Sequence, residues 1–532
     1  MRIPTHLTPA AALAALALLI GCAAPNTPAA PGSQAAATTT TAAATPAATP
    51  QSRDQLRPEL GPTEVKAMTF NIWIGGAVID SAQVVAAIRQ SGADIVGLQE
   101  AEGNTAAIAA ALGWHASQRT MIISRFPLIE PPDAESPQGL DYVYAQLAPG
   151  QIIAVANIHL TSDPYGPYAV RDGQNLDAVL AQESEIRVPE IEERLDAWKE
   201  LTSAGVPLLI TGDFNTPSHR DWTEATVGAL PHMRYAVAWP VTKAVEGAGF
   251  VDTFRAANPD PVADPGRTWT YGYPYPRLAA DEAIDRIDFV FASPDVTVLA
   301  SQVVGETGTP DVDIPLSPYP SDHRAVVSTL RADPVEPPVF VAVEQVRVPA
   351  GERLLVRYHA PGGAETDRLA ILPAGGAVPA DELMWLPPQE AEHFGAVRFG
   401  SGGLEPGPYA AVLVGADNRE LSRSAFWIVA RDAAPAVSVA KPSYAQGEPI
   451  TVRWSAAPAQ MRDWVSIYPA GTLDLYNGYL AYTYTGATVA GEHSFGPDDL
   501  GAEMLPPGEY IATLSSDDGY AILAQTRFTV GP

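Results

Sequence analysis

The sequence predicts an α+β protein, in which a four-layer α/β/β/α sandwich is followed by two small all-β sandwich modules. Three observations predict this fold class. Short apolar strand patterns alternate with helical stretches between residues 65 and 330, as in a pair of sheets flanked by helices. The helical signal ends at the proline-rich stretch 331–338. The segments after that stretch repeat one another.

The repeat is visible in two pairs of segments. Residues 351–358 (GERLLVRY) match residues 447–454 (GEPITVRW), and the stretch from Asp367 matches the stretch from Asp463 at the same offset. Short strands between Gly/Pro turns are typical of β-sandwiches. The two modules resemble the immunoglobulin-like accessory domains of exported bacterial enzymes.

The chain of 532 residues is longer than one hydrophobic core organises. Composition changes along the chain predict its division. The predicted parts are a signal peptide at 1–21, a lipid-anchored disordered Ala/Thr/Pro linker at 22–62, the α+β domain at 63–332, and β-sandwich modules at 336–431 and 436–532.

The N-terminal apolar stretch, Ala10 to Ile20, is too short to span a bilayer and matches the core of an export signal. The following Leu19-Ile20-Gly21-Cys22 resembles a bacterial lipobox, in which Cys22 would become the acylated first residue. The alternative is an ordinary secretory signal with an incidental thiol. We expect an exported bacterial lipoprotein of the cell envelope or cell surface, held at the membrane by its lipid anchor.

The charge of the chain limits its partners. Acidic residues number 61 and basic residues 32, which gives a net charge of -29. Such a field repels phosphate backbones, and the sequence has no Lys/Arg run of the nucleic-acid-binding type. Nucleic acid is therefore expected only as a substrate, with help from a bound cation or a local basic groove.

Polar residues stand at the ends of the apolar strand patterns of the α+β domain. A strand end holds a side chain rigidly at the rim of a sheet, where carboxylates, amides and imidazoles suit a hard cation and a phosphate. Taken singly, each of these residues has a plainer interpretation, as a turn, a cap, a solvated strand end or a core histidine. The residues are Asn71, Glu100, His159, Asp213, Asn215, Asp288, Asp322 and His323.

The order of the segments is more specific than any one of them. F-N, Q-E, S-R-F-P, N-I-H-L, G-D-F-N, R-I-D-F and S-D-H follow one another between residues 70 and 323. This order resembles the endonuclease/exonuclease/phosphatase superfamily, which has the fold of pancreatic deoxyribonuclease. The resemblance covers residues 63–332 and implies a metal-dependent hydrolase of phosphoric esters.

The expected cofactor is Mg²⁺, or Mn²⁺ or Ca²⁺ in its place. Glu100 and Asp322 offer carboxylates to such an ion, and Asn71 would bind the ion, its water or a phosphate oxygen. One cysteine is too few for a thiolate site, and no H-E-x-x-H motif indicates zinc.

The remaining residues are assigned to catalysis. Asp213 would orient or deprotonate the attacking water, and Asn215 would hydrogen-bond a metal-bound water or a phosphate oxygen. His159 and His323 would meet the charge that develops on the phosphoryl group, while Asp288 would fix the tautomer of His323. Asp213 and His323 remain rival candidates for the general base.

One departure from the family concerns His159. Some members carry a supporting glutamate before the S-R-x-P segment, whereas residues 118–121 here contain no carboxylate. Asp141 is a candidate substitute.

Substrate contacts are the least readable part of the sequence. Trp269, in the aromatic stretch 268–275, and Arg171 are the candidates, and a packed loop and a surface salt bridge are their plainer interpretations. The expected substrate is a phosphomonoester or phosphodiester, such as a nucleotide, a nucleic acid, a phosphoinositol or a phospholipid headgroup. The alternative function is a catalytically inactive cell-surface binding protein. The C-terminal modules would bind a surface polymer or act as spacers.

Overall fold

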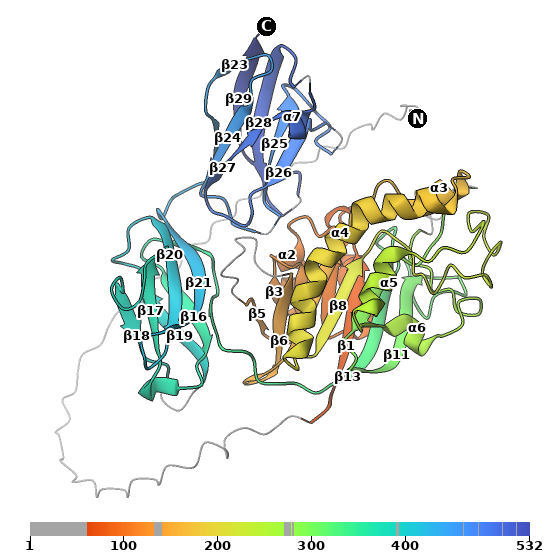
Figure 1. Ribbon diagram of the computed structural model, residues 1–532, viewed down its shortest axis with the longest axis horizontal. Coiled ribbons are helices and arrows are strands. Elements are labelled where there is room, and N and C mark those ends of the chain that lie inside the picture. Colours follow the sequence, from red (N-terminus) through yellow and green to blue (C-terminus); the bar gives the residue numbers. More distant parts are fainter. Residues whose placement is uncertain are drawn as a thin grey trace, which may run out of the picture. The chain divides into compact units, whose positions relative to one another are not determined.

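The computed structural model describes residues 61–531, except 132–140, 271–277, 279–280, 390–392 and the single positions 461, 477, 503 and 518 (Figure 1). The signal peptide, Cys22, the linker and the aromatic residues 271–275 therefore lie outside the described residues. Within the described part of the chain, no helix has both the length and the apolar character of a membrane span.

Two β-sheets form the centre of the α+β domain. The seven-stranded sheet has the order β12-β11-β13-β1-β2-β4-β3, and the six-stranded sheet has the order β5-β6-β7-β8-β10-β9. The strands are β1 (Thr63–Asn71), β2 (Ile95–Gln99), β3 (His115–Ser117), β4 (Ile122–Ser124), β5 (Leu128–Ile129), β6 (Tyr142–Ala148), β7 (Gln151–His159), β8 (Leu208–Asp213), β9 (Val251–Asp252), β10 (Asp288–Ala292), β11 (Thr297–Glu306), β12 (Ile314–Leu316) and β13 (Ala325–Ala332).

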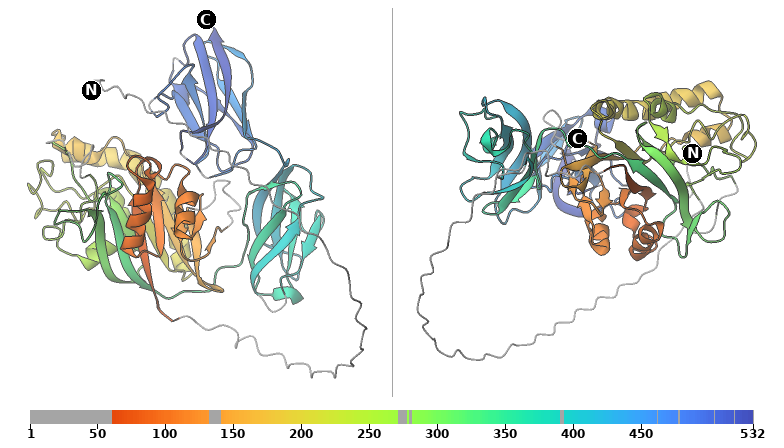
Figure 2. Two further views of the ribbon diagram at one scale, coloured as in Figure 1. Left: turned by 180° about the vertical axis from the view of Figure 1, so that it is seen from behind. Right: turned by 90° about the horizontal axis from the view of Figure 1, so that it is seen from below.

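The two sheets pack face to face. Alternate residues of β1, such as Val65 and Ala67, share a buried cluster with Val155 of β7, Leu209 of β8 and Val290 of β10. Because successive side chains of a strand point to opposite faces, the intervening residues of β1 face the helices outside. The predicted four-layer α/β/β/α sandwich is therefore confirmed (Figure 2).

The outer layers are helical. α1 (Ser81–Ser91) and α2 (Thr105–Leu112) pack on the seven-stranded sheet, and α4 (Leu176–Ser203) and α5 (Pro240–Gly247) cover the six-stranded one (Figure 1). Asp80 caps α1, because its carboxylate accepts a hydrogen bond of 2.9 Å from the Ala82 amide at the N-terminus of the helix. Two short helices, α3 (Gly166–Arg171) and α6 (Thr253–Ala257), lie in loops.

The sequence predicts a helical stretch from Asp172 to Ser203 that is interrupted near Pro189, and this prediction is wrong. Helix α4 runs unbroken through Pro189. An interior proline costs about 3 kcal/mol. Trp198 and Ile191, each at most 1% exposed, offset that cost, since each fully buried side chain of this kind contributes about 1.5–3 kcal/mol.

The C-terminal part of the chain consists of two repeated β modules. In the first, the sheets are β14-β16-β19 and β15-β21-β20-β17-β18; in the second, they are β22-β24-β27 and β23-β29-β28-β25-β26. The two strand orders correspond position by position, which agrees with the repeat in the sequence. The strands are β14 (Phe340–Val343), β15 (Arg347–Pro349), β16 (Arg353–His359), β17 (Arg368–Pro373), β18 (Met384–Leu386), β19 (Phe394–Gly400), β20 (Gly407–Val414), β21 (Glu420–Val429), β22 (Ala436–Val439), β23 (Ser443–Ala445), β24 (Ile450–Ser455), β25 (Trp464–Pro469), β26 (Ala481–Tyr484), β27 (Gly491–Phe495), β28 (Gly508–Ser515) and β29 (Ile522–Gly531).

Candidate active site

The predicted polar residues meet at one edge of the sandwich. β1 and β2 run parallel and place Asn71 opposite Gln99, while β7 and β8 run parallel and place His159 opposite Asp213. β10 is antiparallel to β8 and begins at Asp288, opposite Asp213. The ends of strands from both sheets therefore form the rim of a single site.

Strand alternation also explains why these side chains face one another. Asn71 continues the β1 series that contains the inward residues Val65 and Ala67, and Asp213 continues the β8 series that contains Leu209. The site is thus the polar end of the core between the two sheets.

The Asp213 carboxylate is the centre of the site and is 1% exposed. Its Oδ2 accepts a hydrogen bond of 3.0 Å from Asn71 Nδ2. The same oxygen lies 3.6 Å from His159 Nε2 and 3.7 Å from His323 Nε2. Its Oδ1 accepts a hydrogen bond of 2.9 Å from the Asn215 backbone amide. One carboxylate thus joins four of the predicted segments.

Asp288 lies behind His323, as the sequence predicts. Its Oδ2 is 3.0 Å from His323 Nδ1, so the carboxylate sets the orientation of the ring. Burial opposes a charge on His323, but Asp288 and Asp213 outweigh it and raise the pKa of His323 to about 10. Burial raises the pKa of Asp288 to about 6, against the effect of His323. At neutral pH, the pair is therefore an imidazolium beside a carboxylate.

Glu100 and Asp322 form the acidic border of the site. Asn71 Nδ2 donates to Glu100 Oε1 at 3.0 Å, and the Ile74 amide donates to Glu100 Oε2 at 3.0 Å. Burial raises the pKa of Asp322 to about 6; His323 opposes this effect, and the charge of Glu100 adds to it. A cation placed near this border would relieve the repulsion between the two carboxylates.

Among the described residues, one group of His and Asp side chains has the spacing of a metal site. The ligand atoms of Asp213, Asp288 and His323 lie within 4.8 Å of one another, and all three residues are buried. This set differs from the predicted ligands Glu100, Asp322 and Asn71, although Asn71 bonds to both Glu100 and Asp213. Carboxylate oxygens dominate the combined set, which suits Mg²⁺, Mn²⁺ or Ca²⁺.

Asn215 contributes its backbone as well as its side chain. Its φ of 50° turns the chain directly after Asp213. Its Nδ2 donates a hydrogen bond of 2.9 Å to the Leu160 carbonyl, so the amide nitrogen ties β8 to the segment after His159. The expected hydrogen bond to a phosphate oxygen would therefore come from the second N–H of Nδ2, because Oδ1 can only accept.

The two substrate candidates lie in different settings. The Trp269 ring lies against His323, with centroids 4.6 Å apart. Arg171 is engaged in local contacts, because its Nε donates to Asp172 Oδ1 at 2.9 Å and its guanidinium lies 4.4 Å over the Tyr168 ring. The salt-bridge interpretation of Arg171 thus describes the structure, whereas Trp269 lies beside His323.

Asp141 is held by a different partner. Its Oδ2 lies 2.7 Å from Arg194 Nε of helix α4. The ion contact that the structure gives for His159 is the one with Asp213.

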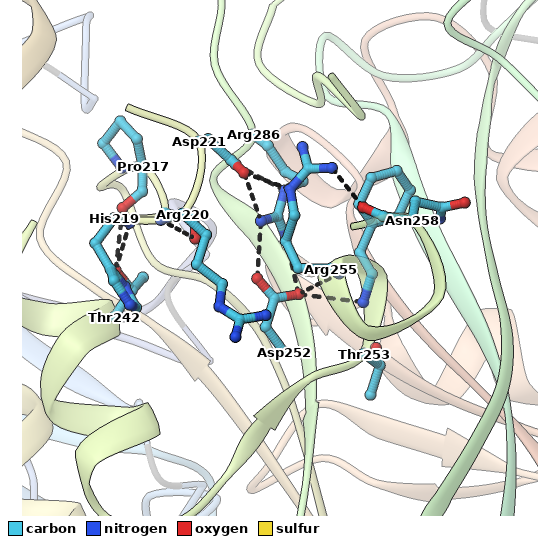
Figure 3. Close-up of polar contacts among 12 residues, drawn as sticks. Pro217, His219, Arg220, Asp221, Thr242, Asp252, Thr253, Arg255, Asn258 and Arg286 are labelled. Carbon is cyan, nitrogen blue, oxygen red and sulfur yellow. Dashed lines mark hydrogen bonds and ion pairs between the residues drawn. The ribbon is translucent and has the colours of Figure 1, made fainter. Parts of the chain in front are cut away.

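The sequence analysis missed a buried ion cluster behind Asp288. Arg286 Nε lies 2.9 Å from Asp221 Oδ2, and its Nη2 lies 2.8 Å from Asp252 Oδ2 (Figure 3). Arg255 Nε lies 2.5 Å from Asp221 Oδ1. These contacts fix the chain two residues before Asp288. Asp221 lies in a loop and Asp252 in the two-residue strand β9, and neither segment is long enough or regular enough to give a periodic signal.

A second missed contact joins the two sheets beneath the site. Gln99 Nε2 donates to Asn157 Oδ1 at 2.6 Å, and Thr211 Oγ1 donates to the same oxygen at 3.0 Å. Gly97 allows this close approach, since a Cβ there would lie 1.9 Å from Thr211 Oγ1. The glutamine of Q-E and the asparagine of N-I-H-L therefore hold the two sheets together.

A sheet sandwich with a buried Asp/His cluster at its rim defines the class of protein, a hydrolase fold of the phosphoesterase type. Residues 68–323 match the Endonuclease/Exonuclease/phosphatase family and form a domain of that family. Hydrolases of this family act on phosphoester bonds.

The chain is also similar to a curated relative and to several solved structures. An uncharacterized protein of Caenorhabditis elegans is 36% identical over 292 residues, which cover 49% of this chain and 90% of that protein. A Beutenbergia cavernae endonuclease/exonuclease/phosphatase is 19% identical, covering 68% of this chain and 99% of its own, with a TM-score of 0.31. An AP endonuclease of Archaeoglobus fulgidus is 19% identical, covering 50% and 98%, with a TM-score of 0.33.

Proposed function

We propose that this protein hydrolyses a phosphomonoester or phosphodiester by attack of an activated water, with a divalent cation as cofactor. The observation that carries the proposal is the convergence of Asn71, His159 and His323 on Asp213 Oδ2, with Asp288 behind His323. A buried anion between two imidazoles and an amide can orient a water and meet phosphoryl charge within one site.

The roles of Asp213 and His323 follow from their surroundings. His323 contacts the carboxylates of Asp213 and Asp288, which favour the imidazolium form at neutral pH. An imidazolium cannot accept a proton, so the role of general base falls to Asp213. His323 would stabilise charge on a phosphoryl oxygen or donate a proton to the leaving group, and Asp288 would keep its ring in place.

The cation would be held by the acidic side of the site. Glu100 and Asp322 are its predicted carboxylate ligands, and Asn71 donates hydrogen bonds to both Glu100 and Asp213. Bound there, a divalent ion would neutralise phosphoryl charge. Asn71 would hold the carboxylates of Glu100 and Asp213 in position for the ion.

We propose that the substrate is a small phosphoester rather than a long polyanion. The net charge of -29 opposes nucleic acid at long range. Free nucleotides, phosphoinositols and phospholipid headgroups carry fewer phosphates and meet less repulsion. The lipobox resemblance of residues 19–22 supports a further proposal, that the enzyme acts at the bacterial cell envelope as a lipoprotein.

The test is hydrolysis by the purified protein across phosphomonoesters, nucleotides, single-stranded DNA and sphingomyelin, each with Mg²⁺ and with EDTA. We expect metal-dependent turnover on at least one class, which Asp213→Asn and His323→Ala both abolish. The control is His115→Ala, because His115 is exposed on β3. If no substrate is turned over, or if turnover survives both active-site changes, the alternative of an inactive cell-surface binding protein replaces this proposal.

A further inference from the structure

A buried carboxylate outside the predicted set connects several parts of the site. Asp285 is 4% exposed and stands three residues before Asp288. Its Oδ1 accepts a hydrogen bond of 2.9 Å from Trp222 Nε1 and lies 3.3 Å from His232 Nε2. Its Oδ2 accepts a hydrogen bond of 3.1 Å from the Tyr165 hydroxyl.

The three partners come from the two segments that follow β7 and β8. Tyr165 follows β7, which ends at His159, whereas Trp222 and His232 follow β8, which ends at Asp213. Asp285 itself leads into β10, which begins at Asp288. Its side chain therefore fixes the spacing between three strands whose ends form the site.

The backbone of Asp285 adds a fourth segment. Trp269 N donates to Asp285 O at 2.9 Å, and Asp285 N donates to Trp269 O at 2.7 Å. Trp269 forms a second bridge with His323, and its ring lies 4.6 Å from the His323 ring, between centroids. Trp269 is thus held between Asp285 and the catalytic histidine.

We propose that Asp285 is a positioning residue, which holds the Trp269 ring against His323 and so fixes the imidazole that faces the substrate. The inference rests on the proposed phosphoesterase function. A buried carboxylate persists only where donors compensate its desolvation, and three side chains from two segments do so here. This arrangement makes the position of Trp269 depend on the Asp285 side chain.

The contrast with the Arg286 cluster supports a specific role. Arg286, Asp221 and Asp252 hold the start of β10, and within the described residues no hydrogen bond or ring contact joins them to Trp269. A substitution in the Arg286 cluster would loosen β10 as a whole. A substitution of Asp285 would also displace Trp269, and through Trp269 it would displace His323.

The test is a double-mutant cycle between Asp285→Asn and Trp269→Leu, measured on the substrate that the wild-type protein turns over. Asparagine keeps the shape of Asp285 and one carbonyl-type acceptor for Trp222 Nε1. We expect Asp285→Asn to lower kcat by about tenfold to a hundredfold with little change in KM, because a small misplacement of a catalytic group has effects of that size. In the Trp269→Leu background, Asp285→Asn should lower kcat by less than about threefold.

A second readout does not depend on turnover. Amide hydrogen exchange of peptides that contain Trp269 should accelerate in Asp285→Asn, while exchange in β1 and β2 stays at the wild-type rate. Asp196→Asn is the matched control, since the Asp196 side chain is 90% exposed in an i,i+3 pair on helix α4. It should change neither kcat nor exchange.

The outcomes separate the two proposals. The positioning role would be overturned if Asp285→Asn lowered kcat by the same factor with and without Trp269. It would also be overturned if hydrogen exchange at Trp269 stayed unchanged. Either result would leave the phosphoesterase proposal intact. Loss of folding in Asp285→Asn is monitored by the exchange in β1 and β2, and Tyr165→Phe then replaces it as the milder variant. If the wild-type protein turns over no phosphoester, the proposed function fails, and the exchange result alone decides whether Asp285 holds Trp269.

Discussion

Replacing Asp288 with asparagine should move the alkaline limit of activity toward neutral pH. His323 carries a pKa of about 10 instead of 6.5, and Asp288 is the nearest of the carboxylates responsible, at 3.0 Å. An adjacent opposite charge shifts a pKa by about 1–3. We therefore expect the pKa of His323 to fall by about 2 in Asp288→Asn, since Asp213 remains in place.

The sign of the effect follows from the role of the imidazolium. His323 acts in its protonated form, so activity is present below its pKa and is lost as the pH rises through it. The alkaline limb of kcat/KM should therefore move from near pH 10 in the wild type to near pH 8 in the variant. The value of kcat at the optimum should also fall by about 10²–10⁴, because the ring loses its orienting partner.

The measurement is a pH profile of kcat/KM from pH 5 to pH 11, at saturating Mg²⁺. In the wild type, the acid limb should lie near pH 6, where Asp288 and Asp322 ionise. If the acid limb persists in Asp288→Asn, Asp288 is not the group that causes it. An alkaline limb at the same pH in the variant and the wild type would refute the assignment of that limb to the His323–Asp288 pair.

Three further changes test other parts of the molecule. Glu100→Gln should lose activity that extra Mg²⁺ partly restores, whereas Asp213→Asn should lose at least about 10²-fold in kcat with no restoration by metal; a metal titration of both variants decides this. Cys22→Ser should move the protein from the membrane fraction to the soluble fraction of its bacterial host, and unchanged partitioning would contradict lipid attachment. Arg187→Met should lower the free energy of unfolding by about 3–5 kcal/mol in urea titrations, because it leaves the buried Glu183 without its ion partner. A second change, Glu183→Gln, should recover part of that loss.

The residues of the candidate site were easier to predict from the sequence than the residues that hold them in place. The site residues stand at the ends of strands, where the alternation of inward and outward side chains can be read from the sequence. Asn71 and Asp213 each extend an alternating series of inward residues, so their meeting at one rim follows from the register of two sheets. Trp269 illustrates a middle case. Its residue type indicated a substrate contact, but its position beside His323 depends on pairing with the distant Asp285.

Residues that lie in loops escaped the sequence analysis. Asp221, Trp222 and His232 belong to the long irregular segment after β8, where no period of two or 3.6 links a residue to a face. The unbroken helix at Pro189 has a similar cause. Local propensity predicts a break there, and burial against a sheet that the local sequence cannot reveal overrides it.

The first and last strands of the α+β domain pair with each other, so the domain can complete its fold only after its last strand has been synthesised. β1 pairs with β13 along its length, so that Thr63 lies opposite Ala332, and Ser321 Oγ donates to the Asn71 carbonyl across 250 residues of sequence. Contacts of such range form slowly, since a long loop must close before they stabilise the chain. A growing polypeptide that has not yet reached His323 holds Asn71 and Asp213 without the imidazole that completes them. On the proposed function, we therefore expect hydrolysis only once the whole domain has left the ribosome, and no activity from chains that end within it.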